Sequence, residues 1–450
     1  FAMGIEYAIL MPTVWKYVQS VGGSKTHLGL LLAGFSMTRT ISFLIVGYWS
    51  DRRPMREPFI FSFILGAIGS LLYGLAGGLN SLGVMMLGRL VAGIGAANTT
   101  LNQTYIARTA SADRRTKLLS FCRGCAVLGI ASGPLLNLFL LKLDDSDLCT
   151  GRFCLNSMTS AGYVMAIVNM ALCLSFMVLF VEPPPQASSR SISYQRPDEI
   201  GTIQESKYHE IEEVEEPTAM QAINIVICQR AGWFCLMINF VTGFEMTALE
   251  TAVTPITAEQ YGWGTQENSY LFGAITVLAI MAIVSTIVFD KQKCCSPRLV
   301  LVLAQVSLGI AFAVALGACG GPDIPLWGLF TFGGFLVYGV VLQATPALGV
   351  YSTMIGDFDK GVFMGYSQIV LGVARILGPL FAGVTLEFHT HWLLMATACA
   401  VYVFTPISFP FVWKKIVKHA DKGSFSQAEG SVDVDSQRLL KDQSSDFTSA

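Results

Sequence analysis

Long apolar stretches recur along the whole chain, and the charged residues are concentrated between them. A helix needs about 20 mainly apolar residues to cross a bilayer. Of the 450 residues, 53% are hydrophobic and only 13% are charged, whereas roughly 25% of a soluble domain is charged. Because a chain in lipid must satisfy its backbone hydrogen bonds internally, the pattern predicts an all-α polytopic membrane protein.

The apolar segments form two sets of six, separated by a polar stretch. The first six helices are predicted over 1–20, 27–50, 58–77, 82–107, 118–141 and 159–181. The other six are predicted over 222–252, 268–289, 299–318, 327–352, 362–386 and 391–413. The intervening stretch contains three consecutive prolines and an acidic run, a composition typical of a disordered linker. The expected domains are therefore an N-terminal half (1–181), a cytosolic linker (182–220), a C-terminal half (221–413) and a cytosolic tail (414–450).

Lysine and arginine are distributed unevenly between the loops of the two sides. One side carries Arg52, Arg53, Arg56, Arg108, Arg114, Arg115, Lys117, Lys291, Lys293, Arg298, Lys360, Lys414, Lys415 and Lys418. The other side carries Lys25, Lys142 and Arg152. Because basic loops stay in the cytosol, we expect the linker and both termini to be cytosolic. Residue 1 is Phe within an apolar stretch, so we expect the natural chain to begin further upstream.

Two cysteines lie in the loop after the fifth predicted helix, on the non-cytosolic side. In a lumenal or extracellular compartment, Cys149 and Cys154 can form a disulfide. The alternative is two free thiols in a short loop. Most other cysteines lie within predicted helices, where a small buried apolar side chain is the expected role.

An internal repeat relates the two halves. Three pairs of features occur in the same order and at nearly the same separation. They are Asp51-Arg52 with Asp290-Lys291, Gly133-Pro134-Leu135 with Gly378-Pro379-Leu380, and Glu6 before Pro12 with Glu250 before Pro255. Repeats of this kind place the substrate site at the interface between the halves.

The loop from Gly47 to Arg56 packs one acid and three arginines between two apolar helices. It resembles the loop signature of the major facilitator superfamily, Gly-x-x-x-Asp-(Arg/Lys)-x-Gly-(x)-(Arg/Lys), although Pro54 replaces the usual glycine. The segment from Arg89 to Gly95 resembles the arginine motif of the fourth helix in that superfamily. The resemblance implies a major facilitator fold of twelve helices in two pseudo-symmetric halves, with the substrate cavity between them.

Further segments resemble a lysosomal branch of this superfamily, that of ceroid-lipofuscinosis neuronal protein seven, also called major facilitator superfamily domain-containing protein eight. They are residues 48–50, 53–54, 57–58, 88–90, 93–96, 250–255, 262–267 and 374–379. The similarity covers most of the helical core but not the linker or the tail. It implies a member of this branch or a divergent paralogue.

Charged residues within the predicted helices are the main functional candidates, because each needs a partner or water. Glu6 lies in the first helix, and Glu245 and Glu250 point in different directions from the seventh. In the superfamily these two helices line the cavity, so Glu6 and Glu250 are expected to face each other. A desolvated carboxylate favours its neutral form and can accept a proton from an acidic lumen, which predicts a coupling role. The alternative is a structural carboxylate that binds a buried arginine or caps a broken helix.

Arg39, Arg89 and Arg375 lie within predicted helices two, four and eleven. A guanidinium group can bind an anionic substrate through its planar set of donors, or it can neutralise a buried glutamate and gate the cavity. Asn98 and Asn102 are one helical turn apart in helix four and are candidates for lining the cavity. Polar packing between helices is the alternative for both.

The resemblance implies a cytosolic gate built from Gly47, Asp51, Arg52 and Arg56, with Asp290 and Lys291 as the counterparts in the second half. In the superfamily, the acid of this loop pairs with basic residues and helix ends across the cytosolic face. Because an exposed ion pair contributes only about 0–1 kcal/mol, a network must carry the effect of such a latch.

The tail contains Asp435, Leu439 and Leu440 in the spacing of an acidic dileucine sorting signal. With the resemblance, this signal predicts a lysosomal or late endosomal membrane; the alternative is the plasma membrane. The sequence contains no metal-ligand cluster, nucleophile–base pair or phosphate-binding loop, so we expect neither an enzyme nor a bound cofactor or metal.

These features together predict a secondary transporter that moves a small polar or anionic solute by alternating access coupled to protons. The expected partners are the bilayer, the solute, protons and sorting adaptors, with no nucleic acid, and we expect a monomer. One alternative is a passive, chloride-like anion conductance in which Arg39 or Arg89 sets selectivity. The other is a non-transporting sensor or scaffold that acts through the linker and tail.

Overall fold

The computed structural model describes residues 1–110, 112–143, 148–150, 153–182, 230–291, 297–318, 324–354, 360–388, 392–403 and 405–406. The expected linker, the tail and the sorting-signal residues Asp435, Leu439 and Leu440 lie outside these residues. The side chains of Asp51, Cys149, Asp290 and Lys291 also lie outside the described part. Within the described residues the chain is helical apart from one short β-hairpin.

Each of the twelve predicted segments contains helix. The first half comprises α1 (Ala2–Ala8), α2 (Val14–Ser20), α3 (Lys25–Arg52), α4 (Arg56–Gly78), α5 (Leu82–Gly95), α6 (Asn98–Thr109), α7 (Ala112–Leu140), η1 (Leu141–Leu143), β1 (Leu148–Thr150), β2 (Phe153–Leu155) and α8 (Ser157–Leu179). The second half comprises α10 (Arg230–Tyr261), α11 (Thr265–Lys291), α12 (Pro297–Ala318), α13 (Leu326–Met354), α14 (Lys360–Glu387) and a final helix over Trp392–Val403.

The composition of these helices is that of a bilayer-spanning bundle. Among the described residues, eight helices are long and apolar enough to cross a membrane. Their outward faces carry large apolar side chains, including Leu44, Ile167, Val178 and Val277. A monomeric soluble protein does not expose apolar surface on this scale. The chain is therefore a multi-pass membrane protein.

Prolines have different effects in the two pseudo-equivalent helices. The first predicted helix is interrupted around Pro12 into α1 and α2, as expected of a residue without a backbone donor. The seventh was predicted to end at residue 252, and this boundary is wrong because α10 continues through Pro255 to Tyr261. Neighbouring threonines supply side-chain hydrogen bonds to the backbone, such as Thr257 Oγ1 to Thr254 O at 3.2 Å. Pro255 leaves the carbonyl of Thr251 without its helical donor, a loss that a helix packed within a membrane bundle tolerates.

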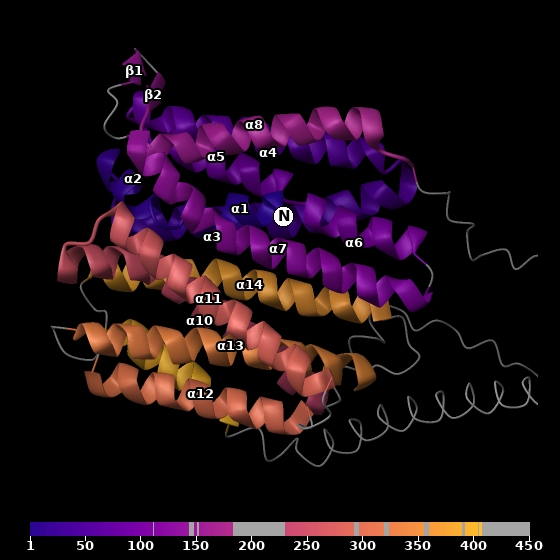
Figure 1. Cartoon of the computed structure of the whole chain (residues 1–450), viewed down its shortest axis with the longest axis vertical. Helices are drawn as coiled ribbons and strands as arrows, with labels where there is room; N and C mark the ends of the chain where they lie inside the picture. The colour runs from indigo at the N-terminus through magenta and orange to yellow at the C-terminus, as the bar shows by residue number, and fades with distance from the viewer. Residues whose placement is uncertain are drawn as a thin grey trace, which may run out of the picture.

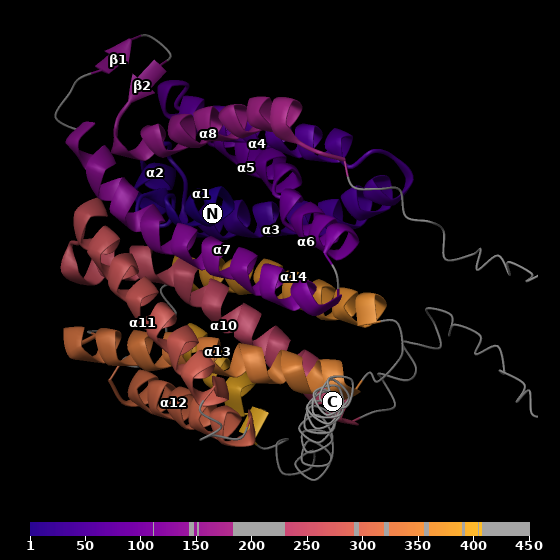
Figure 2. The same ribbon diagram turned by 45° about the vertical axis from the view of Figure 1, so that its right-hand side comes forward.

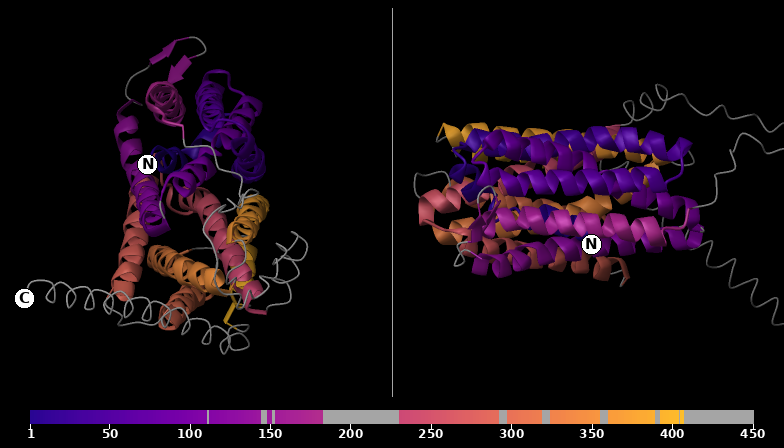
Figure 3. Two further views of the ribbon diagram at one scale, coloured as in Figure 1. Left: turned by 90° about the vertical axis from the view of Figure 1, so that its right-hand side faces the viewer. Right: turned by 90° about the horizontal axis from the view of Figure 1, so that it is seen from above.

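The two halves lie side by side, with α1–α8 in one and α10–α14 in the other (Figures 1 and 2). The principal contacts between them are α3 against α14 and α7 against α11. Within the halves, α4 packs on α5 and α8, while α12 packs on α13. The helices run roughly along a common direction, as the view along the bundle shows (Figure 3). This arrangement leaves α1 and α10 facing each other near the centre.

The β-hairpin marks one end of the bundle (Figure 2). Its antiparallel register places Cys149 directly opposite Cys154, and Cys154 is disulfide-bonded. We call this end the hairpin end; α3 begins there, at Lys25, and α10 and α14 finish there. The opposite end, where α3 finishes at Arg52, is the Arg52 end.

Candidate functional site

One hydrogen bond joins the two halves near the middle of the bundle. The hydroxyl of Tyr7 on α1 donates to Oε2 of Glu250 on α10. The two residues are separated by 243 positions in the chain, so only the packing of the halves brings them together. Tyr7 was not predicted as a site residue. Its signal was modest: it follows Glu6 in the sequence, and a buried tyrosine hydroxyl usually needs a polar partner.

Two arginines from opposite halves flank this hydrogen bond. Arg39 of α3 and Arg375 of α14 both act electrostatically on Tyr7, and Arg375 also acts on Glu250. The two guanidinium groups also act on each other as like charges. Glu250 is therefore a carboxylate that Arg375 compensates at the junction of the halves, whereas Arg39 acts on Tyr7 and on Glu6.

Arg39 has unused hydrogen-bonding capacity. Its Nε is buried and has no hydrogen-bond partner in the structure, and its Cζ lies 5.3 Å from the centroid of the Phe43 ring. A buried donor without an acceptor costs free energy, about 1–3 kcal/mol. The centre can therefore lower its free energy by taking up an acceptor such as an anion, a polar solute or water.

Glu6 lies in a different place from the one expected. Its neighbour Tyr7 contacts Glu250, whereas Glu6 lies in a small cavity inside the first half, formed by α1, α4, α5 and α8 and also lined by Ser70, Tyr73 and Arg89. The cavity has room for the centre of about one water molecule, roughly 10 Å³. The structure thus separates the two carboxylates that the repeat was expected to bring face to face.

Arg89 supplies the main positive charge near Glu6. Glu6 is 8% exposed and Arg89 is 3% exposed, and Asn169 lies within hydrogen-bonding reach of the carboxyl group. The Cζ of Arg89 lies 4.2 Å from the centroid of the Phe35 ring, a distance at which a cation is attracted by the ring face. Arg89 is therefore held within the first half rather than at the junction.

Glu245 lies apart from the central groups. It is 2% exposed, and both of its carboxyl oxygens are buried without a hydrogen-bond partner among the residues that the structure describes. Its electrostatic neighbours are Cys399 and Tyr402 of the final helix, so it lies inside the second half. Glu245 and Glu250 therefore point to different surroundings, as their spacing predicted.

The two asparagines of α6 are not equivalent. Asn98 is buried, and its Oδ1 has no hydrogen-bond partner within the described part of the chain. Asn102 is exposed, with its Nδ2 only 3.9 Å from the sulfur of Met3. Asn98 is thus the better candidate for a polar contact with a bound solute, and a joint role for both residues stays a prediction.

Residues of the loop at the Arg52 end contact other parts of the first half. Arg56 donates from Nη2 to the carbonyl of Met177, and the Glu182 carboxylate accepts from the backbone N–H of Arg56 at 3.2 Å. The guanidinium of Arg52 lies over the ring of Tyr48, 4.1 Å from its centroid. Gly47 lies within α3, and a Cβ there would meet open space. A latch from this loop to Asp290 and Lys291 stays a prediction, because their side chains lie outside the described part.

The comparisons with known proteins agree with this fold. The family model of the Major Facilitator Superfamily matches residues 1–379. In structure, the chain is similar to a bacterial homolog of the human lysosomal transporter Spinster in its inward-facing and occupied conformation, with a TM-score of 0.68, 14% identity, and coverage of 93% of this chain and 94% of that chain. It is also similar to a D-xylose–proton symporter, with a TM-score of 0.64, 15% identity, and coverage of 91% and 94%.

Two curated relatives span most of the chain. Major facilitator superfamily domain-containing protein 8 of Xenopus laevis is 22% identical over 93% of this chain and 90% of its own length, which confirms the predicted resemblance to that branch. An SPX domain-containing membrane protein of Arabidopsis thaliana is 24% identical over 91% of this chain, but only 61% of that protein is covered. The family match, the helical halves and these relatives agree, and the chain belongs to the major facilitator superfamily.

Proposed function

We propose that this chain is a secondary transporter that moves a small polar or anionic solute by alternating access coupled to protons. The observation that carries the proposal is the hydrogen bond from Tyr7 to Glu250, which joins the halves beside Arg39 and Arg375. A contact that spans two halves has to break or rearrange when they rock against each other. Gain or loss of a proton at Glu250 can therefore be linked to the conformational change.

The charges suggest how the link works. An ionised Glu250 accepts a charge-assisted hydrogen bond from Tyr7 and offsets the charge of Arg375. A proton on Glu250 removes that negative charge and leaves Arg375 without its compensating carboxylate, beside the like charge of Arg39. An anionic group of a solute then replaces the carboxylate, because planar guanidinium groups bind such groups through several donors. The negative charge beside the arginines thus comes from Glu250 when it is ionised and from the solute when Glu250 is protonated.

The proposed location is the membrane of the lysosome or late endosome, with the hairpin end in the lumen. Cys154 is disulfide-bonded, and disulfides form and persist in oxidising compartments. We propose that the second cysteine is Cys149, which lies opposite Cys154 in the β-hairpin. The arginine-rich loop lies at the opposite end, as it should if that end is cytosolic. The dileucine signal at Leu439 and Leu440 and the structural similarity to a homolog of a lysosomal transporter support the same compartment.

Reconstitution tests the proposal. The purified chain is placed in proteoliposomes, and uptake of acidic, basic and neutral amino acids, sugars and chloride is followed with and without a proton ionophore. Saturable uptake of a solute that stops when the pH gradient is collapsed supports the proposal. A non-saturating chloride current that varies linearly with voltage indicates the passive conductance instead. Absence of flux for every solute, with retained binding of adaptors to the tail, indicates the sensor or scaffold.

A further inference from the structure

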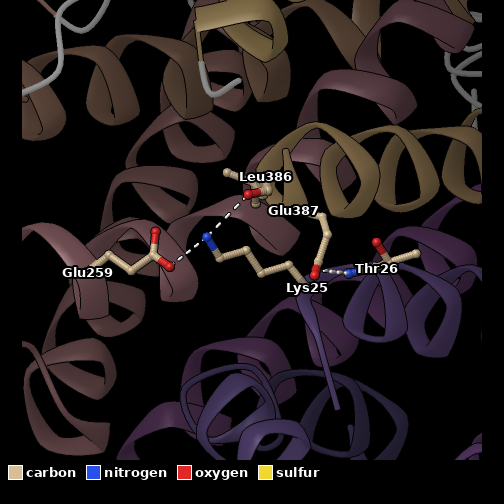
Figure 4. A network of polar contacts seen from close by, with 5 residues as sticks. All are labelled: Lys25, Thr26, Glu259, Leu386 and Glu387. Atoms are coloured by element: carbon tan, nitrogen blue, oxygen red, sulfur yellow. Dashed lines mark hydrogen bonds and ion pairs between the residues drawn. The ribbon is translucent and has the colours of Figure 1, made fainter. Parts of the chain in front are cut away.

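A second group of polar contacts joins the halves at the hairpin end (Figure 4). Nζ of Lys25, at the start of α3, lies 2.5 Å from Oε1 of Glu259 on α10 and 3.2 Å from the carbonyl oxygen of Leu386 on α14. The backbone N–H of Thr26 donates to Oε2 of Glu387 at 3.2 Å. We call these five residues the hairpin-end clamp.

Lys25 is an unusual residue to find in this position. Its side chain is only 8% exposed, although lysine is rarely buried without a partner. Both groups that its ammonium contacts belong to the opposite half. If the halves separated at this end, Lys25 would lose both partners in a single step.

The partial charges at the ends of α3 and α14 favour these contacts. The α3 N-terminus, which carries partial positive charge, receives the Glu387 carboxylate from the end of α14. The α14 C-terminus, which carries partial negative charge, receives the Lys25 ammonium from the start of α3. The two helices therefore compensate each other's termini across the boundary between the halves.

Close backbone packing lies directly beneath these contacts. A Cβ added to Gly29 of α3 would lie 2.4 Å from the carbonyl oxygen of Pro379, and one added to Gly383 of α14 would lie 2.8 Å from the carbonyl oxygen of Lys25. Small residues at a helix crossing permit this approach in a membrane. The clamp and the glycine contact together close the hairpin end of the bundle between α3 and α14.

We propose that the hairpin-end clamp is the gate of the transport path at this end, with Lys25 as the residue that holds it shut. The inference rests on the proposed function, because a gate matters only if the halves alternate. It assigns to Lys25, Glu259 and Glu387 a role separate from solute and proton binding at the centre. Opening this end exchanges the two contacts of Lys25 for water and frees the first turn of α3.

Hydrogen–deuterium exchange of the full chain in lipid nanodiscs tests the gate without a transported solute. Three variants are compared with the wild type: Lys25→Met, Glu259→Gln and the control Lys16→Met. Lys16 is an exposed lysine on neighbouring α2. Glu259 is 48% exposed, so its variant carries the test if Lys25→Met fails to fold.

Loss of Lys25 should raise amide exchange about fivefold at the start of α3 and at the ends of α10 and α14. Exchange should fall at residues 45–60, because one end closes when the other opens.

The outcomes separate the gate from the proposed function. Opposite changes at the two ends in Lys25→Met and Glu259→Gln, but not in Lys16→Met, support the gate whether or not a solute has been found. Faster exchange confined to the hairpin end, with residues 45–60 unchanged, overturns it and leaves the clamp as a static contact. Exchange like that of the wild type overturns it as well. Failure of all solute uptake by the wild type, alongside opposite changes in exchange, would count against the transporter and not against the gate.

Discussion

Each half buries a glutamate, but the groups that surround the two carboxyl groups differ. Glu6 on α1 lies in a cavity with Arg89 and within reach of Asn169. Glu245 on α10 has neither a hydrogen-bond partner nor an opposing charge among the described residues. Both lie on the first described helix of their half, although the repeat pairs Glu6 with Glu250 and not with Glu245. The two halves thus bury acids in different surroundings.

The polar groups around Glu245 bind one another instead. Nε2 of Gln305 donates to Oε1 of Gln343 at 2.9 Å, and the hydroxyl of Tyr402 donates to the carbonyl oxygen of Gln305 at 2.5 Å. Nε2 of Gln343 in turn donates to Thr242 Oγ1 at 2.8 Å. This network in the second half is therefore neutral, whereas Glu6 in the first half lies beside the charge of Arg89. Symmetry of the fold therefore does not extend to the charges around the buried acids.

Arg89→Met gives the largest effect expected from this comparison. It leaves Glu6 buried without its main compensating charge, and breaking a buried pair costs about 3–5 kcal/mol. Chemical denaturation of the chain in detergent should show this loss. The double variant Arg89→Met/Glu6→Gln should recover most of it. A loss below about 1 kcal/mol in the single variant would show that Glu6 does not depend on Arg89.

Glu245→Leu should change stability in the opposite direction. It removes a buried group without a partner, and replacing such a group by an apolar one of similar size should stabilise the chain by about 1–2 kcal/mol. The same substitution at Glu6 should destabilise it, because Arg89 would be left unpaired. Thermal unfolding of the two variants side by side checks the prediction. If both substitutions destabilise equally, the contrast between the halves is wrong.

Tyr7→Phe tests the contact between the halves and should have the smallest effect on stability. One hydrogen bond to a carboxylate is lost, which corresponds to about 1 kcal/mol, while the charge of Glu250 is kept. Solute uptake should slow, and its dependence on the pH gradient should persist. A Tyr163→Phe variant is the control, because that hydroxyl is buried and has no hydrogen-bond partner in the described residues. Equal effects of the two substitutions would remove the Tyr7 contact from the mechanism.

The sequence was sufficient for the fold because lipid imposes a strong constraint on it. Apolar runs of bilayer length located every helical segment, and the loop at Gly47–Arg56 led to the superfamily that the comparisons confirm. It was also sufficient to identify buried charges at Glu6, Arg39, Arg89, Glu245 and Glu250 as unusual. One boundary failed at Pro255, because a helix packed within a membrane bundle can continue through a proline.

The partners of these charges could not be predicted. Lys25 was interpreted only as a loop charge, because nothing in its neighbourhood in the sequence indicates contacts with Glu259 and Leu386 across the halves. Tyr7 was missed for the same reason, since its partner lies 243 positions away. Pairing at this range depends on how the halves pack, and a repeat predicts equivalent positions without predicting equivalent neighbours.

The central claim is that Glu250 couples protons to transport, and Glu250→Gln tests it most directly. Glutamine can still accept the hydrogen bond from Tyr7, so the contact between the halves is kept while the titratable charge is lost. Glu267→Gln, an exposed acid in the first turn of α11, is the matched control. The measurement is the rate of solute uptake into proteoliposomes across a series of imposed pH gradients. Uptake by Glu250→Gln should no longer respond to the gradient, whereas uptake by Glu267→Gln should respond as in the wild type. A Glu250→Gln variant that folds and keeps the full response to the gradient would contradict it.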